Sequence, residues 1–173
     1  MERIMIVGTN SGAGKSTLAR MLGEKLDIKP VHLDALFVKP GWVVLTDEEL
    51  GEKIMEILPK DKWIIDGAYA AIKFKERVER ADIIIMFDFN RFKCFYGAVK
   101  RHVMYYKKSR PDLCEGCVGK FDWQSAWNIL WYSPRNRKRR LNRLKNLTDK
   151  NIYIFKNLKQ VASFLEGVSK FDE

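Results

Sequence analysis

The sequence predicts an α/β fold of three layers, in which a five-stranded parallel sheet carries helices on both faces. Short apolar runs recur at residues 4–7, 31–33, 63–65, 83–87 and 152–155. Most of them are continuous rather than alternating, as expected for strands that are covered on both faces. Segments with helical periodicity separate the runs, and this alternation indicates parallel strands joined by right-handed crossovers.

The first expected strand, residues 4–7, leads into a glycine-rich stretch, after which Leu18, Leu22 and Leu26 repeat with a helical period. A buried strand, a glycine-rich turn and a helix start form the context of a phosphate-binding loop, or P-loop. Backbone N–H groups of such a loop converge on the phosphates of a nucleotide. We therefore assign nucleotide binding to Gly8, Thr9, Asn10, Ser11, Gly12, Ala13, Gly14, Lys15, Ser16 and Thr17.

Within this loop, Lys15 is expected to reach the β- and γ-phosphates, and Ser16 to place its hydroxyl on Mg²⁺. The usual spacing has a glycine at position 9, where this chain has Thr9, and Gly8 stands one residue too early. Either Thr9 tolerates the backbone angles there, or the loop is one residue longer than usual. The two later glycines of the loop stand where the backbone is expected to pass close to the ligand.

The second expected strand, residues 31–33, is followed by Asp34. Ligands of open α/β sheets sit beyond the carboxyl ends of the strands, so Asp34 is a candidate catalytic residue. It could accept a hydrogen bond from a substrate hydroxyl, act as a base or help to hold the metal, or it could be a loop carboxylate that caps nearby N–H groups. His32 is expected to be a packed strand histidine.

Helix and turn signals follow the second strand. Lys39-Pro40-Gly41 predicts a turn. Thr46 and Glu49 form the signature of a capping box, and the apolar residues after them fall on one helix face. The sequence therefore predicts a helix that begins at Thr46.

Two acidic residues end the next two expected strands. Asp66 follows residues 63–65, and Asp88 follows residues 83–87. In P-loop proteins, an acidic residue that ends a strand beside the loop binds Mg²⁺, often through water. We choose Asp66 for the metal site, with Asp88 as the second candidate and an ordinary strand-terminal turn as the alternative for both.

Residues 90–148 do not continue the alternation of short strands and helices. They predict helices at about 92–107, 123–131 and 135–144, which we interpret as a helical lid inserted into a single domain of residues 1–173. Residues 91–145 contain 15 Lys/Arg and 3 Asp/Glu, a net charge of +12, whereas the remainder has 17 and 19, a net charge of −2. This segment is expected to meet anions. Its candidate phosphate-stabilising arginines are Arg91, Arg101, Arg110, Arg135 and Arg139. For any one of them the alternative is a solvated helix face, whereas for the group a lid role is favoured.

Three tryptophans in this segment, Trp123, Trp127 and Trp131, recur at helical spacing and form one stripe. Burial of the stripe against the domain is the favoured interpretation, and base stacking is the alternative. Cys114 and Cys117 have half the spacing of a zinc site, but paired partners are missing elsewhere, so a tight turn is favoured.

The composition is that of a globular protein. The chain has 173 residues, of which 46% are apolar. Three cysteines do not form a secreted disulfide framework, and neither a membrane span nor a signal-peptide pattern is visible. We expect a cytoplasmic protein without a membrane partner.

Taken in order, these motifs resemble the topology modulation protein (FlaR) family, a branch of the adenylate-kinase-like P-loop proteins. The motifs are the P-loop, residues 32–37, 39–42, 63–69 and 79–82, then 87–88, 100–101, 110–112, 116–117 and the tryptophan-rich helix. The resemblance implies binding of ATP or GTP, dependence on Mg²⁺ and a phosphotransferase-like fold. It supports the metal role of Asp66 and implies a base-pocket role for Asn157. Ala68 departs from the family pattern, in which Asn is expected.

Two functions follow from these predictions. The favoured one is a kinase-like enzyme that moves the γ-phosphoryl group of ATP to a small acceptor such as a nucleotide, a nucleoside or a sugar-like alcohol. The alternative is a nucleic-acid-associated ATP-binding protein that affects DNA topology, in which the basic segment docks phosphates. The kinase is favoured because a closing lid accounts for the arginines, and no known nucleic-acid motif is visible. The sequence leaves the acceptor and the oligomeric state open.

Overall fold

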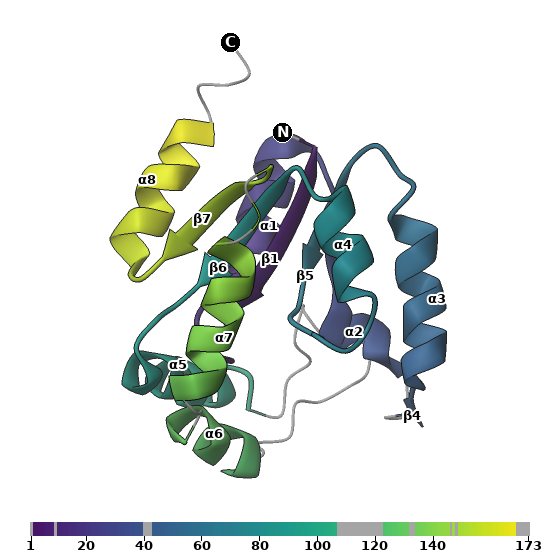
Figure 1. Ribbon diagram of the computed structural model, residues 1–173. Helices are drawn as coiled ribbons and strands as arrows, with labels where there is room; N and C mark the ends of the chain where they lie inside the picture. Colours follow the sequence, from purple (N-terminus) through teal and green to yellow (C-terminus); the bar gives the residue numbers. More distant parts are fainter. Residues whose placement is uncertain are drawn as a thin grey trace.

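The computed structural model describes residues 2–8, 10–39, 43–106, 123–131, 134–145, 147 and 149–168. Its centre is a five-stranded parallel sheet with the strand order β2-β5-β1-β6-β7 (Figure 1). All five predicted strands are confirmed, with ends that shift by one residue at most. They are β1 (Arg3–Gly8), β2 (Pro30–His32), β5 (Trp63–Asp66), β6 (Ile83–Phe87) and β7 (Asn151–Phe155).

The strand that leads into the P-loop lies in the middle of the sheet. Ile4 of β1 pairs with Ile64 of β5 on one side and with Ile83 of β6 on the other. All three side chains are buried. The loop that follows β1 therefore starts at the centre of the carboxyl edge, where parallel α/β sheets place their ligands.

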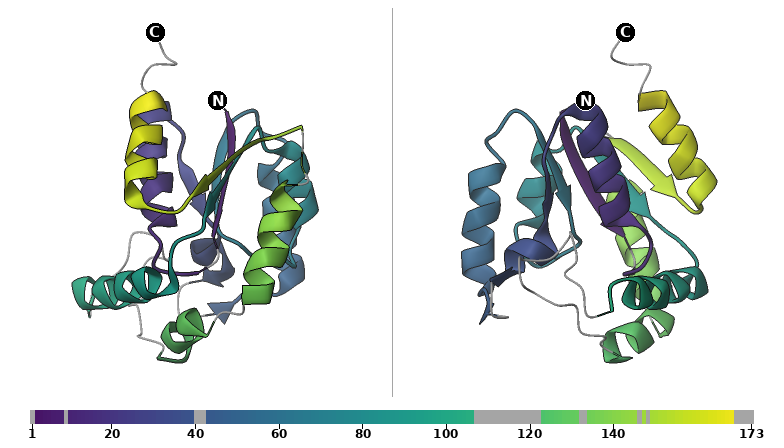
Figure 2. Two further views of the ribbon diagram at one scale, coloured as in Figure 1. Left: turned by 60° about the vertical axis from the view of Figure 1, so that its left-hand side comes forward. Right: turned by 180° about the vertical axis from the view of Figure 1, so that it is seen from behind.

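Helices cover both faces of the sheet (Figures 1 and 2). Helices α1 (Lys15–Leu26) and α8 (Leu158–Val168) pack on one face through a cluster that includes Leu22 and Leu165. Helices α3 (Asp47–Ile57), α4 (Phe74–Arg80) and α7 (Pro134–Lys145) share the cluster on the other face. The predicted three-layer α/β architecture is confirmed.

The capping box at the start of α3 is confirmed. The Glu49 backbone N–H donates to Thr46 Oγ1 at 3.2 Å, and the Thr46 N–H donates to Glu49 Oε2 at 2.8 Å. These reciprocal bonds satisfy two backbone donors that the helix itself cannot pair.

The connection after β2 differs from the prediction. Leu33, which was expected in the strand, begins the short helix α2 (Leu33–Phe37), and Asp34 lies in its first turn. The strands β3 (Val38–Lys39) and β4 (Val43–Val44) then pair antiparallel. The predicted turn is consistent with this hairpin, although its residues 40–41 lie outside the described ones.

The described residues of the predicted lid segment form three helices. They are α5 (Arg91–Met104), α6 (Trp123–Leu130) and α7, which begins at Pro134, a residue suited to the first helical position. Residues 107–122, with Arg110, Cys114 and Cys117, lie outside the described residues. In the ranges that are described, no helix is long and apolar enough to span a membrane.

The prediction that the tryptophan stripe is buried is wrong for the two members whose side chains are described. Trp127 is 56% exposed and Trp131 is 71% exposed. Helix α6 instead packs through Ile129, which is 5% exposed, and its carboxyl end accepts a hydrogen bond at 3.0 Å from the Arg91 guanidinium to the Leu130 carbonyl. Helical spacing placed the tryptophans on one face but could not say which face meets the core.

Candidate functional site

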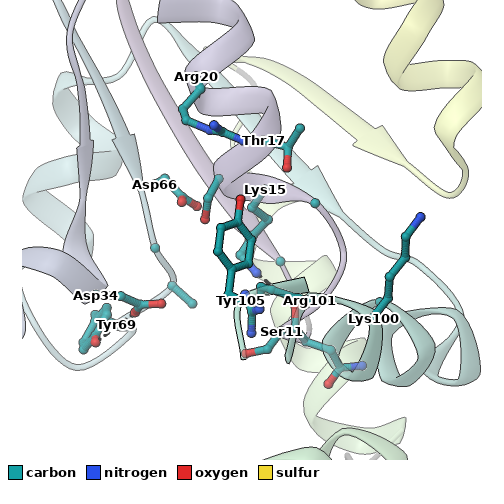
Figure 3. Close-up of a pocket in the computed structure, with 18 of the residues that line it drawn as sticks. Ser11, Lys15, Thr17, Arg20, Asp34, Asp66, Tyr69, Lys100, Arg101 and Tyr105 are labelled. Atoms are coloured by element: carbon teal, nitrogen blue, oxygen red, sulfur yellow. Dashed lines mark hydrogen bonds between the residues drawn. The ribbon is translucent and has the colours of Figure 1, made fainter. Parts of the chain in front are cut away.

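A pocket of about 490 Å³ opens at the carboxyl edge of the sheet. The P-loop, the start of α2, the loop after β5 and helix α5 form its walls (Figure 3). It brings together these predicted site residues: Gly8, Asn10, Ser11, Gly12, Gly14, Lys15, Ser16, Thr17, Asp34, Asp66 and Arg101. Ala13 is buried behind the loop, and Thr9 and Arg110 lie outside the described residues.

The end of α1 that faces this pocket is suited to an anion. The helix begins at Lys15, its cap residue Gly14 has φ 93°, and no side chain caps the helix. The first turn contains no acidic residue. Amide donors and the positive end of the helix dipole therefore point into the pocket without a competing carboxylate. The Lys15 ammonium donates to the Asn10 carbonyl at 2.9 Å and so lies inside the same loop.

Two glycines of the loop, Gly8 and Gly12, lie close to protein neighbours. A Cβ atom on Gly8 would lie 2.9 Å from Lys15 Cδ. A Cβ atom on Gly12, which has φ 76°, would lie 2.1 Å from the Cys94 carbonyl oxygen of α5, and one on Gly97 would lie 2.2 Å from the Gly12 carbonyl oxygen. Around Gly14 nothing lies within 4 Å of such an atom. The backbone of α5 therefore rests directly on the P-loop at Gly12, and the space beside Gly14 is open.

Asp66 fits the predicted metal role. Its side chain is buried at the end of β5, and its Oδ2 atom lies 3.0 Å from His32 Nδ1 in a hydrogen bond. Its Oδ1 atom is buried and has no hydrogen-bond partner among the described residues. A buried carboxylate oxygen without a partner, in a pocket that also contains Ser16, suits Mg²⁺ or a water bound to it. His32 is packed as predicted, and the structure adds that it orients this carboxylate.

Within the described ranges, no three His, Cys, Asp or Glu side chains gather into a metal cage. The predicted magnesium site does not require one. Mg²⁺ keeps several waters and is usually held by one or two protein ligands together with substrate phosphates. The pair of Ser16 and Asp66 therefore has the composition expected for a metal that arrives with a nucleotide.

Asp88, the second metal candidate, has a different role. Its carboxylate is buried at the end of β6 and accepts hydrogen bonds from Arg137 Nε at 2.6 Å and Arg137 Nη2 at 2.5 Å. These contacts raise the pKa of Arg137. One turn further along α7, Arg140 donates to the Gly8 carbonyl at 2.6 Å and lines the pocket. Helix α7 is therefore attached to the ends of β6 and β1, and Arg140 joins the site although the sequence analysis did not select it.

The opposite wall of the pocket carries a hydrogen-bonded pair. Tyr69 Oη donates to Asp34 Oδ1 at 3.0 Å, and Figure 3 shows both side chains across the pocket from the P-loop. Burial raises the pKa of Tyr69, and the charge and hydrogen bond of Asp34 raise it further, so the phenol stays neutral. The phenol holds Asp34 in place and leaves its second carboxylate oxygen for another donor.

A buried arginine holds the loop that carries Tyr69. Arg77 of α4 has no exposed surface, and its guanidinium donates to five backbone carbonyls at 2.7–3.3 Å. The acceptors are the carbonyls of Gly67, Ala68, Tyr69, Ile72 and Lys73.

This loop contains residues with positive φ, at 26° for Tyr69 and 46° for Lys73, which a non-glycine residue adopts at a cost. Burial lowers the pKa of Arg77 to about 10, with Glu76 opposing, so the guanidinium stays charged at neutral pH. Sequence reasoning missed Arg77 because a single arginine on a helix resembles a surface charge.

The remaining predicted residues lie outside the main pocket. Arg135 and Arg139 are exposed on α7, and neither is among the residues that line it. Arg139 borders a smaller recess of about 170 Å³ beside Ala68. Asn157 is exposed and caps α8, because its side-chain oxygen accepts the Gln160 N–H at 3.0 Å. The pocket instead recruits basic side chains that the sequence analysis did not select, namely Arg20, Lys100 and Arg140.

No protein-family model matches this chain, and no curated protein matches it. Among solved structures, the chain is similar to the crystal structure of shikimate kinase from Bacteroides thetaiotaomicron, with a TM-score of 0.56. The identity is 16%, and the alignment covers 98% of this chain and 97% of that one. At this identity the likeness concerns the fold alone. The chain has the α/β fold of a P-loop kinase.

Proposed function

We propose that this protein is a Mg²⁺-dependent phosphotransferase that moves the γ-phosphoryl group of ATP to a hydroxyl group of a small acceptor. The observation that carries the proposal is a single pocket with two unlike walls. The P-loop with Lys15 forms one wall, and the pair of Asp34 and Tyr69 forms the other. A phosphate donor and a hydroxyl acceptor would therefore meet in one pocket.

The donor wall would bind the triphosphate. Amides of the P-loop and the start of α1 would surround the phosphates, and Lys15 would exchange its bond to the Asn10 carbonyl for a phosphate oxygen. Ser16 and Asp66 would hold Mg²⁺, which neutralises phosphate charge when it is bound. Arg101 and Arg140 line the pocket and would stabilise charge on the transferring group.

The acceptor wall would activate the hydroxyl. The acceptor O–H proton would pass to Asp34 while its oxygen forms the new bond to the γ-phosphorus. The bond from that phosphorus to the bridging oxygen would break, and ADP would leave with the electron pair. Tyr69 would keep Asp34 oriented through its hydrogen bond to that carboxylate. Burial raises the pKa of Tyr69, so the phenol keeps the proton that it donates. Nucleotide-like or nucleoside-like acceptors remain the favoured class.

Several details of this function stay predictions. The resemblance to the topology modulation protein family, the action of residues 90–148 as a lid on one domain, and the cytoplasmic location belong to them. So do the roles of Arg110, Arg135 and Arg139 at the transferring phosphate, of Asn157 at the base, and the preference for ATP over GTP. The alternative nucleic-acid function is not adopted, because the pocket accounts for a nucleotide and a small acceptor.

The experiment begins with calorimetric titration of the full chain with ATP in the presence of Mg²⁺. The expected result is saturable binding that Lys15→Ala weakens strongly. Transfer of labelled γ-phosphate to a panel of hydroxyl acceptors follows. Asp34→Asn should keep ATP binding and lose transfer, because it keeps the hydrogen-bonding shape and removes the base. Absence of saturable ATP binding would reject the proposal, and full transfer by Asp34→Asn would reject the assignment of the base.

A further inference from the structure

Two helices on one face of the sheet each carry a row of exposed charges, negative on one helix and positive on the other. Helix α3 carries Glu48, Glu52 and Glu56, which we call the acidic stripe, and α7 carries Arg135, Arg139 and Arg143, which we call the basic stripe. All six side chains are exposed. Each stripe repeats at i, i+4 and i+8, so its members lie in one row along the helix.

Neighbouring members of each stripe lie four residues apart and carry the same charge. Like charges four residues apart repel and destabilise a helix. Within the described part of the chain, none of the six side chains takes part in an ion pair. Both rows therefore present unneutralised charge to the outside.

The two stripes match each other in length and position. Each spans nine residues, and its first and last members are about 12 Å apart at the helical rise. Helices α3 and α7 belong to the same hydrophobic cluster, and α4 lies between them (Figures 1 and 2). A groove of about 810 Å³ is lined by Glu48 and Glu52 on one side and by Arg143 on the other. The helix in between is close to neutral on its exposed side, where Lys75 and Glu79 pair at 3.6 Å.

We propose that this face is the interface of a homodimer, in which the acidic stripe of each copy contacts the basic stripe of the other. In a two-fold symmetric interface, contacts occur reciprocally. If the two-fold axis passes near α4, the acidic stripe of each copy lies on the basic stripe of the other. A nucleic acid would neutralise only the basic stripe and would be repelled by the acidic stripe beside it. A second copy of this chain is the partner that accounts for both rows. The inference does not require the proposed catalytic function, but it gives Arg135 and Arg139 a different role from the one predicted at the transferring phosphate.

The first measurement is sedimentation equilibrium of the full chain after removal of nucleic acid. At about 50 mM salt, the average mass should approach twice the 20.3 kDa of one chain. At about 500 mM salt, the association should weaken by about 10-fold or more, because exposed charges are screened. A monomer at every salt concentration would overturn the proposal.

Charge reversals identify the contacting rows. Glu48→Arg combined with Glu52→Arg, and separately Arg135→Glu combined with Arg139→Glu, should each weaken self-association by about 100-fold or more. A mixture of the two variants should form heterodimers, because the two unmodified stripes still attract each other and the reversed residues of one variant face reversed residues of opposite charge on the other. This restored association also excludes misfolding as the cause of the loss.

A matched control lies on the other side of the sheet. Lys156→Glu combined with Lys159→Glu changes the net charge by the same amount as the arginine reversal, at exposed positions beside and within α8. This control should dimerise like the unmodified chain. Failure of the mixed variants to associate, or equal loss in the control, would overturn the proposal. Tight salt-dependent binding of duplex DNA by a chain that stays monomeric would assign the basic stripe to nucleic acid instead.

Discussion

Replacing Arg77 by methionine would test whether this buried guanidinium holds the acceptor wall of the site. The side chain has no exposed surface and donates to five carbonyls between Gly67 and Lys73. Methionine keeps a comparable apolar length but donates no hydrogen bond. The variant therefore removes the contacts without opening a large cavity.

The expected loss follows from the environment of the acceptors. The bonds to the carbonyls of Gly67 and Ile72 are buried, and the other three are partly accessible. A buried acceptor that loses its partner costs about 1–3 kcal/mol, so these two carbonyls together cost about 2–6 kcal/mol. The partly accessible carbonyls regain water, and the variant no longer buries a charge. We expect a net loss of about 3 kcal/mol in the free energy of unfolding.

Urea unfolding followed by tryptophan fluorescence measures this loss, because Trp63 is buried. Amide exchange in residues 67–73 should accelerate more than exchange in the strands. Arg77→Lys, which keeps the charge but has fewer donors, should show about half the loss. Lys75→Met on the same helix is the control, because that side chain is 86% exposed, and it should change stability by less than about 0.5 kcal/mol. A loss below about 1 kcal/mol for Arg77→Met, or no change in local exchange, would refute the reasoning.

Two further predictions concern the P-loop contact and an ion pair at the start of β1. Gly97→Ala would place a methyl group 2.2 Å from the Gly12 carbonyl oxygen, so α5 must shift, and both stability and ATP affinity should fall. Gly167→Ala, which has no atom within 4 Å, should be neutral or slightly stabilising in urea unfolding. A hydrogen bond from Arg3 lowers the pKa of Asp82, so its contribution to stability is present above the unfolded pKa near 3.9 and is lost as pH falls through the folded value. Asp82→Asn should therefore be less stable than the unmodified protein at pH 7, with a gap that closes below about pH 4, and a gap independent of pH would contradict this assignment.

The parts of the fold that the sequence predicted well depend on short-range patterns. Five apolar runs became the five strands, because strands covered on both faces need continuous apolar residues. The capping box at Thr46 was predictable because both of its bonds lie within four residues. The glycine-rich loop between β1 and α1 was predictable for the same reason, and eight of the ten residues assigned to it line the pocket.

The parts that escaped prediction depend on contacts between distant residues. Arg140 reaches Gly8 across 132 positions, and Arg137 reaches Asp88 across 49. In the sequence both arginines belong to the same basic run, residues 135–140. No local pattern distinguishes them from the exposed basic residues beside them. The predicted burial of the tryptophan stripe was wrong for a related reason, because the short helix α6 packs against the core through Ile129 instead.

The close contact between Gly12 and Gly97 constrains how this chain can change in evolution. A side chain at either position would clash with the backbone of the other segment and push the loop and the helix apart, whatever its polarity. Both positions are therefore expected to stay glycine among homologues that keep this packing, and a larger residue at either should be accompanied by a displaced or differently paired helix.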